Sequence, residues 1–155
     1  MLGPTTEVQW LYEDASVLYR MGRKHSAILL LLCAVDALAR SAYPATTKSS
    51  ERFEQFLRSK MRRPGRAQVH NIWVPKRDRF FAFEYIIYKF LRCPLIHQGA
   101  RLEASDVEFA VSLEWNDIPH GVKVDPSSGR VILGGELVWE MLEDAILHAA
   151  SKPGA

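Results

Sequence analysis

The most informative stretch of this chain reads Glu84-Tyr85-Ile86-Ile87-Tyr88-Lys89-Phe90-Leu91-Arg92-Cys93-Pro94-Leu95-Ile96-His97-Gln98-Gly99. A nearly all-apolar helix runs into an arginine, and a histidine follows five positions later. Pro94 cannot donate a backbone hydrogen bond and clashes with the turn before it, so the helix is predicted to kink or end near Arg92. An ideal helix would leave Arg92 and His97 about 140° apart, so their convergence requires this distortion or a second copy of the chain.

The composition of the whole chain indicates one ordinary globular domain covering residues 1–155. The chain is 48% hydrophobic and 25% charged, and its length is enough to bury a core. Cys33 and Cys93 lie far apart in apolar runs, which favours buried free thiols in a reducing compartment. The longest apolar run, residues 27–39, is shorter than the ~20 residues of a membrane span, and no leader pattern opens the chain. We therefore expect a cytoplasmic protein that makes no contact with a membrane.

Hydrophobic periodicity predicts a mainly α fold. Spacings of three and four predict an antiparallel helical bundle over about residues 5–99, with its first helix closed by Gly22 and its fourth over 78–91. Residues 66–75 are expected to form a basic loop. The period then changes to two, which predicts a small antiparallel sheet, a β-meander over about 105–134. A closing C-terminal helix is expected over about 136–150.

Arg92 and His97 fit the Arg-x4-6-His motif of HEPN domains. Arg20 with His25 and Arg63 with His70 fit it too, but only the Arg92 pair stands at the end of a buried helix, where a side chain is held rigidly. The surrounding run resembles the motif as it occurs in uncharacterised bacterial HEPN-like proteins.

This resemblance implies a fold, a partner and an activity. HEPN domains are helical bundles that commonly dimerise so that two motifs face one cleft. Their catalytic members are metal-independent endoribonucleases, including toxins of toxin–antitoxin systems and phage-defence proteins, and they leave 2′,3′-cyclic phosphate ends. By this resemblance His97 would be the general acid and base, and Arg92 would stabilise charge on the phosphate. The implied partners are a second copy of the chain, RNA or a nucleotide, and, for a toxin, an antitoxin protein.

Other readings of the same residues stay open. The alternative function is that of a non-catalytic HEPN relative, which binds a nucleotide, a nucleic acid or a partner protein. In a purely structural reading of the motif, Arg92 would cap the helix C-terminus and His97 would pack in a turn. A DNA-binding regulator is less favoured, because no helix-turn-helix pattern is found. Asp36 interrupts an apolar helix and needs a partner there; Arg92, which it would orient for catalysis, and Arg40 are both candidates.

A basic segment precedes the motif. Residues 58–79 hold eight Lys or Arg against one acid, which favours a polyanionic partner. The predicted nucleic-acid-binding residues are Arg62, Arg63, Arg66, Trp73, Lys76, Arg77, Arg79 and Lys89. A solvated basic loop with no ligand is the alternative. Tyr85 and Tyr88 are predicted to line the cleft, or else to serve as core or dimer contacts. No phosphate-loop, serine-hydrolase or zinc spacing occurs, so no metal and no cofactor is expected.

Overall fold

The computed structural model describes residues 3–61, 71–92 and 109–150. The chain forms two compact units. The first comprises Met1–Gln68 and Met141–Ala155, and the second comprises Val69–Glu140. In its described part the chain is mainly helical, with five α-helices and two small sheets, which confirms the predicted fold class.

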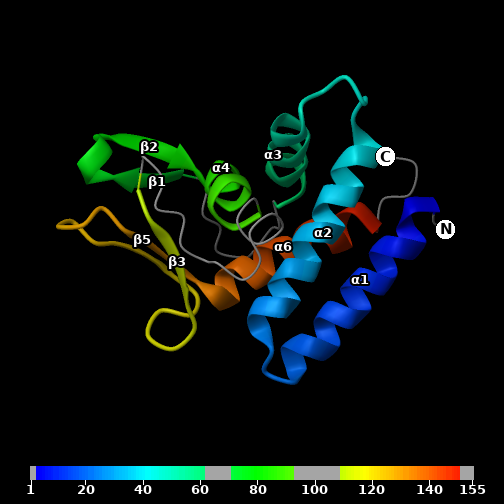
Figure 1. The fold of residues 1–155 in the computed structure, drawn as a ribbon, viewed down its shortest axis with the longest axis horizontal. Helices are drawn as coiled ribbons and strands as arrows, with labels where there is room; N and C mark the ends of the chain where they lie inside the picture. Colours follow the sequence, from blue (N-terminus) through cyan, green and yellow to red (C-terminus); the bar gives the residue numbers. More distant parts are fainter. Residues whose placement is uncertain (1–2, 62–70, 93–108, 151–155) are drawn as a thin grey trace. The chain divides into compact units, whose positions relative to one another are not determined.

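Three helices open the first unit: α1 (Gly3–Arg20), α2 (Lys24–Ala42) and α3 (Ser49–Lys60). The break between α1 and α2 falls at Gly22, as predicted, and its φ of 82° is in the left-handed region that favours glycine. The amide of Arg23 donates to the carbonyl of Leu18 over 2.9 Å and closes the end of α1. Figure 1 shows α1 and α2 as the resulting antiparallel hairpin.

The apolar helix α2 supplies much of the core of this unit. Its buried residues are Ala27, Ile28, Leu31, Leu32, Ala34, Val35 and Ala39. It packs on α1 and α3, and α3 adds buried Phe53, Phe56 and Leu57. Within the described residues, α2 is also the one helix long and apolar enough to cross a bilayer by length and composition, with a mean hydropathy of 1.5. The core helix of a soluble protein and a signal sequence meet the same criterion.

The second unit begins with a hairpin that the sequence analysis did not predict. Strand β1 (Asn71–Val74) pairs antiparallel with β2 (Arg79–Ala82), and the short 3-10 helix η1 (Pro75–Arg77) joins them. Residues up to 75 were expected in a loop, and those from 78 onward in a helix. The strands form because β-branched and aromatic residues dominate this segment, and because Asp78 adopts the left-handed conformation that turns the chain.

The motif-bearing helix follows directly. It begins as α4 (Phe83–Ile86) and continues as the π-helical segment η2 (Ile87–Arg92). The predicted helix over 78–91 therefore starts at Phe83. Phe83, Ile86, Ile87, Phe90 and Leu91 are buried, which agrees with the apolar character of the stretch. A π-helical turn is rare, and it frequently marks a functional site.

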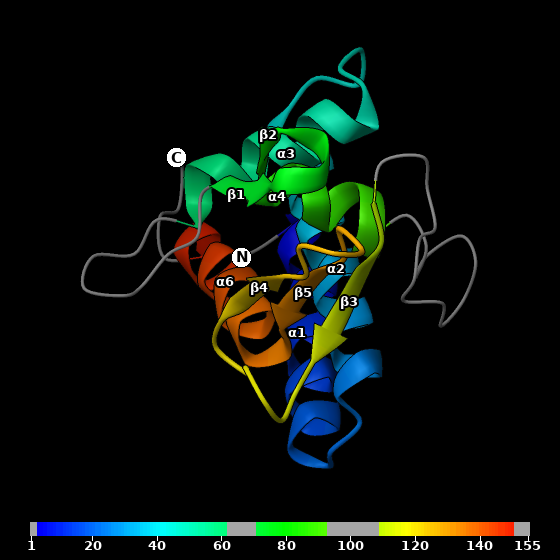
Figure 2. The ribbon, with the colours of Figure 1, turned by 90° about the vertical axis from the view of Figure 1, so that its left-hand side faces the viewer.

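A three-stranded sheet completes the second unit. Strands β3 (Val111–Glu114), β4 (Val122–Val124) and β5 (Val131–Gly134) have the order β3-β5-β4, visible in Figure 2. The hairpin of β4 and β5 is antiparallel as predicted, but β3 pairs parallel with β5, so the sheet is mixed and is not a meander. Two glycines at the end of this sheet allow close packing. A Cβ at Gly134, the last residue of β5, would meet the carbonyl oxygens of Ile118 and Pro119, and a Cβ at Gly135 would meet the ring of Trp115.

Helix α6 (Gly135–Ala150) ends the described chain, where the closing helix was predicted. Its first part belongs to the second unit and buries Leu137, Val138 and Trp139. Its remainder belongs to the first unit and buries Met141, Leu142, Ala145 and Ile146. One helix is therefore shared by both cores.

Candidate functional site

Four of the predicted nucleic-acid-binding residues lie on one hairpin. Trp73 is in β1, Lys76 and Arg77 are in the turn, and Arg79 begins β2. All four side chains are exposed. The turn is tight because Pro75 fixes its first residue and the amide of Asp78 donates to the carbonyl of Pro75 over 3.1 Å. The hairpin therefore carries these basic residues and an exposed aromatic side chain on one short element.

The outer face of this hairpin carries an exposed aromatic pair. Trp73 and Phe80 are directly opposite each other in the strand register, with ring centroids 4.9 Å apart and an edge-to-face angle of 62°. Trp73 is 41% exposed and Phe80 is 63% exposed. Cross-strand aromatic pairs stabilise a hairpin, but two large rings left in water also offer flat faces to a ligand. Phe80 was not singled out by the sequence analysis.

Arg79 lies on the opposite face of the hairpin. Its guanidinium carbon is 4.2 Å from the ring centroid of Phe81, a buried residue two positions further along β2. The Arg79 cation therefore lies over the ring of Phe81, whereas Lys76 and Arg77 lie in the turn between the two strands. A cation over a ring keeps its charge, so Arg79 remains a positive group at the hairpin surface.

The π-helical segment holds two further cations over tyrosine rings. The guanidinium carbon of Arg92 lies 5.1 Å from the ring centroid of Tyr88, and Nζ of Lys89 lies 5.6 Å from that of Tyr85. All four side chains are half-buried. Because each pair is separated by four residues along the helix, ring and cation share one helical face. Tyr85 and Tyr88, which were predicted to line a cleft, are thus each paired with a cation that was predicted to bind phosphate.

An aromatic cluster joins the hairpin to this helix within the second unit. Phe81 stacks on Tyr85 at 5.9 Å and meets Phe109 edge-on at 4.7 Å, and Phe90 stacks on Phe109 at 4.7 Å. Such pairs contribute about 0.5–1.5 kcal/mol each beyond the area they bury. The cluster fixes the hairpin relative to Tyr85, and hence to the segment that ends at Arg92.

The roles of the remaining predicted residues stay predictions. Asp36 is half-buried on α2 in the first unit, and its pairing with Arg92 or Arg40 stays a prediction. His97, Arg62, Arg63 and Arg66 lie outside the described residues. Within the described ranges, no three His, Cys, Asp or Glu side chains converge as metal ligands. Glu84, in the first turn of α4, is a buried carboxylate that the sequence analysis did not single out.

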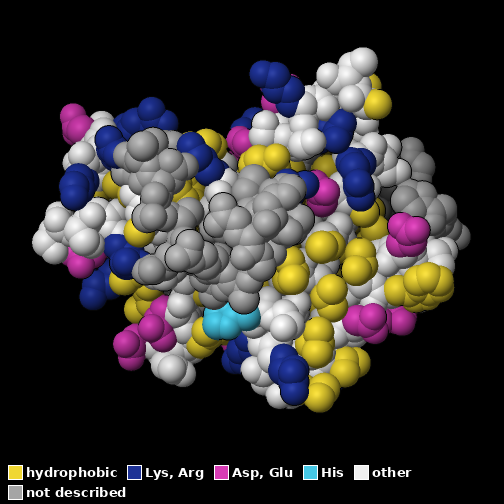
Figure 3. Space-filling model, viewed as in Figure 1, with side chains coloured by type: hydrophobic (Ala, Val, Ile, Leu, Met, Phe, Trp, Pro, Cys, Tyr) yellow, Lys and Arg dark blue, Asp and Glu magenta, His cyan; other side chains and the backbone are white. Residues whose placement is uncertain are grey.

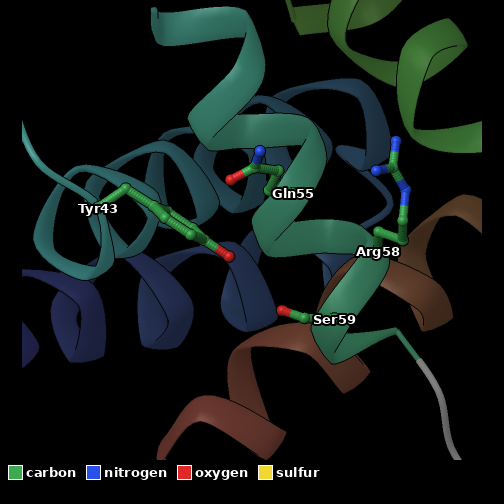
Figure 4. Close-up of a pocket in the computed structure, with 4 residues that line it drawn as sticks. All are labelled: Tyr43, Gln55, Arg58 and Ser59. Atoms are coloured by element: carbon green, nitrogen blue, oxygen red, sulfur yellow. The ribbon is translucent and has the colours of Figure 1, made fainter. Parts of the chain in front are cut away.

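A shallow pocket of about 340 Å³ lies in the first unit, lined by Tyr43, Gln55, Arg58 and Ser59. In Figure 4 the Arg58 guanidinium points away from the Ser59 hydroxyl, so these two groups do not converge on one ligand position. The Ser59 hydroxyl is itself engaged, donating to the carbonyl of Phe56 over 2.9 Å. This pocket has the weaker claim to be a site, and the hairpin of the second unit has the stronger one.

The fold and the hairpin define a mainly helical protein with an aromatic and basic surface on a two-stranded sheet. Comparison with protein families gives its relationship: the family model described as Rv1289 matches residues 15–153. This match covers most of the sequence, and the chain belongs to the Rv1289 family. No curated protein and no solved structure matches the chain.

Proposed function

We propose that this protein binds single-stranded nucleic acid through the hairpin formed by β1 and β2. The observation that supports this most directly is the exposed Trp73–Phe80 pair beside the basic turn. Unpaired bases stack on aromatic side chains irrespective of sequence, and each stacked base contributes about 1–3 kcal/mol. Lys76, Arg77 and Arg79 supply positive charge for the phosphates, so the affinity should fall with salt.

The test is the binding of fluorescently labelled oligouridylate and oligothymidylate, measured by anisotropy at several salt concentrations. Trp73→Ala and Phe80→Ala are each expected to raise Kd by about tenfold, because each removes a stacking platform. Trp10→Ala is the matched control: Trp10 is 62% exposed, on α1 in the first unit. Absence of binding by the parent, or an equal loss in the Trp10 variant, would contradict the proposal.

We propose metal-independent ribonuclease activity as a second candidate. The supporting observation is the π-helical segment that carries Arg92 beside Tyr88 at the end of a buried helix. With the resemblance to HEPN domains, Arg92 would bind the phosphate, and His97 would take a proton from the ribose 2′-hydroxyl or give one to the leaving 5′-oxygen. The 2′-oxygen forms a bond to phosphorus as the bond from phosphorus to the 5′-oxygen breaks. The products are a 2′,3′-cyclic phosphate and a 5′-hydroxyl.

Cleavage of single-stranded and structured RNA in the presence of EDTA tests this candidate. His97→Ala is expected to slow cleavage by about 100-fold or more, because it removes a general acid and base. Arg92→Lys keeps the charge but loses the fork, and should also slow the reaction. His120→Ala is the matched control, because His120 is exposed and its Nδ1 lies 3.7 Å from Oε1 of Glu140.

Light scattering accompanies this assay, because the resemblance pairs two motifs across a homodimer. The expected mass is twice 17.6 kDa. Cleavage that is equal in the parent and in His97→Ala would remove His97 from catalysis. Binding without any cleavage would leave the non-catalytic module as the function.

A further inference from the structure

The turn of the first hairpin is held against the turn of the second. A Cβ placed on Gly129, in the turn between β4 and β5, would lie 2.9 Å from Cδ and 3.2 Å from Cβ of Lys76. The methylene stem of Lys76 therefore occupies the space above Gly129. Gly129 also has a φ of 75°, so both its backbone and its surroundings require glycine.

The second turn is rigid in its own right. The carboxylate of Asp125 accepts hydrogen bonds from the amide of Ser127 at 2.9 Å and from its hydroxyl at 2.7 Å, and these bonds hold the pKa of Asp125 below its ordinary value. The amide of Gly129 donates to the carbonyl of Asp125 over 2.8 Å. Oγ of Ser128 accepts from the amide of Arg130 at 3.2 Å, and the Ser128 side chain also helps to hold the pKa of Asp125 down by hydrogen bonding.

The two turns and the strand residues beside them are rich in basic groups. The acidic residues in these segments are Asp78 and Asp125, and the basic residues are more numerous: Lys76, Arg77, Arg79, Lys123 and Arg130. Figure 3 shows Lys and Arg side chains gathered at the left-hand end, where Figure 1 places the ends of the hairpins. Because its stem is packed while its ammonium is exposed, Lys76 loses less conformational freedom when it binds a phosphate.

We propose that the two turns form one continuous site for the sugar–phosphate backbone of a single-stranded nucleic acid, with Lys76 held in place by Gly129 and with Arg130 supplying positive charge from the second turn. This inference rests on the proposed function and extends it from one hairpin to two. Bases that stack on Trp73 and Phe80 must be unpaired, because a duplex buries the faces of its bases. Their phosphates then pass over the adjoining turns, which carry the positive charge.

A double-mutant cycle between Gly129→Asn and Lys76→Met tests the site in the full-length chain. Asparagine tolerates the left-handed conformation, but its side chain must displace the stem of Lys76. Gly129→Asn is expected to weaken binding of oligouridylate by about fivefold in the parent and to have no further effect in Lys76→Met. Arg130→Gln should weaken binding by about threefold, and it keeps the test decisive if Gly129→Asn does not fold. Gly121→Ala is the control, because Gly121 has no positive φ and a Cβ there would make only an ordinary 3.8 Å contact with Ile118.

The outcomes separate this inference from the proposed function. If Trp73→Ala abolishes binding while Gly129→Asn, Lys76→Met and Arg130→Gln bind as the parent does, the second turn is not part of the site, and the one-hairpin proposal stands. If the parent binds no oligonucleotide, both proposals fail. Binding of duplex as tight as that of oligouridylate, or displacement by polyglutamate as effective as by oligouridylate, would also overturn the inference; the latter would assign an acidic protein as the partner.

Discussion

At the scale of single residues, Tyr12 and Glu143 form a hydrogen bond within the first unit. The Tyr12 hydroxyl, on α1, donates to Oε2 of Glu143, on the second part of α6, over 2.8 Å. Burial raises the pKa of Tyr12 above its ordinary 10.0, and the hydrogen bond and negative charge of Glu143 raise this pKa further. The phenol therefore keeps its proton to a higher pH in the folded protein than in the unfolded chain.

Tyr12→Phe is expected to lower the free energy of unfolding by about 1 kcal/mol near neutral pH, the usual contribution of such a bond. Because the folded pKa is raised, the stabilisation by Tyr12 is complete below pH 10.0 and is lost as the pH rises through the raised value. The difference between parent and variant should thus shrink at a pH of about 10.5. Urea unfolding at both pH values measures it, with Glu143→Gln as the matched partner of a double-mutant cycle. An identical difference at both pH values would contradict the assignment.

The residues of the candidate surface were partly predictable. Local charge was enough to single out Lys76, Arg77 and Arg79, because a run of basic residues can be seen without knowing the fold. Phe80 was missed because it falls inside the helix that was predicted over residues 78–91, and the structure has a strand there. The missed signal was the alternation before the turn, where buried Ile72 and Val74 flank exposed Trp73.

At the scale of elements, Gly22 decides how α1 turns into α2. Its φ is 82°, and a Cβ placed there would find open space within 4 Å. Any loss of stability when another residue replaces Gly22 therefore comes from backbone strain alone. Gly22→Ala is expected to destabilise the protein by about 1–2 kcal/mol, and Gly22→Asn by less, because asparagine visits the left-handed region more readily.

Thermal and urea unfolding of these variants measure the penalty. Gly121→Ala is the matched control: Gly121 has no positive φ, and the nearest atom to its Cβ would be that of Ile118 at an ordinary 3.8 Å. It should change the free energy of unfolding by less than about 0.5 kcal/mol. Equal effects of alanine at positions 22 and 121 would show that backbone strain at Gly22 is not the cause.

The elements themselves were predicted unevenly, for physical reasons. The helices of the first unit were predictable because their buried faces repeat with the helical period over many turns. The strands of the second unit are three or four residues long, too short for alternation to dominate the pattern. The parallel pairing of β3 with β5 depends on contacts between segments distant in sequence, which no local pattern records. The π-helical turn of η2 likewise has no periodic signature that the analysis could use.

At the scale of the whole molecule, two compact units divide a chain whose composition suggested one domain. The chain enters the first unit, passes into the second, and returns to the first within α6. The first unit is therefore built from the two ends of the sequence. Local periodicity detected each helix but not this arrangement, because the change of unit falls between Glu140 and Met141, inside a continuous helix.

Sharing α6 has a consequence for how the protein is made. A ribosome releases the chain from its amino end, so α1, α2 and α3 emerge long before the residues that complete their core. The apolar faces of these helices stay in contact with water until the residues that cover them emerge, near the end of the described chain. Those covering residues are Met141, Leu142, Ala145 and Ile146. A nascent chain of this kind exposes those faces to chaperones and proteases until α6 has emerged, and the emergence of this one helix completes both cores.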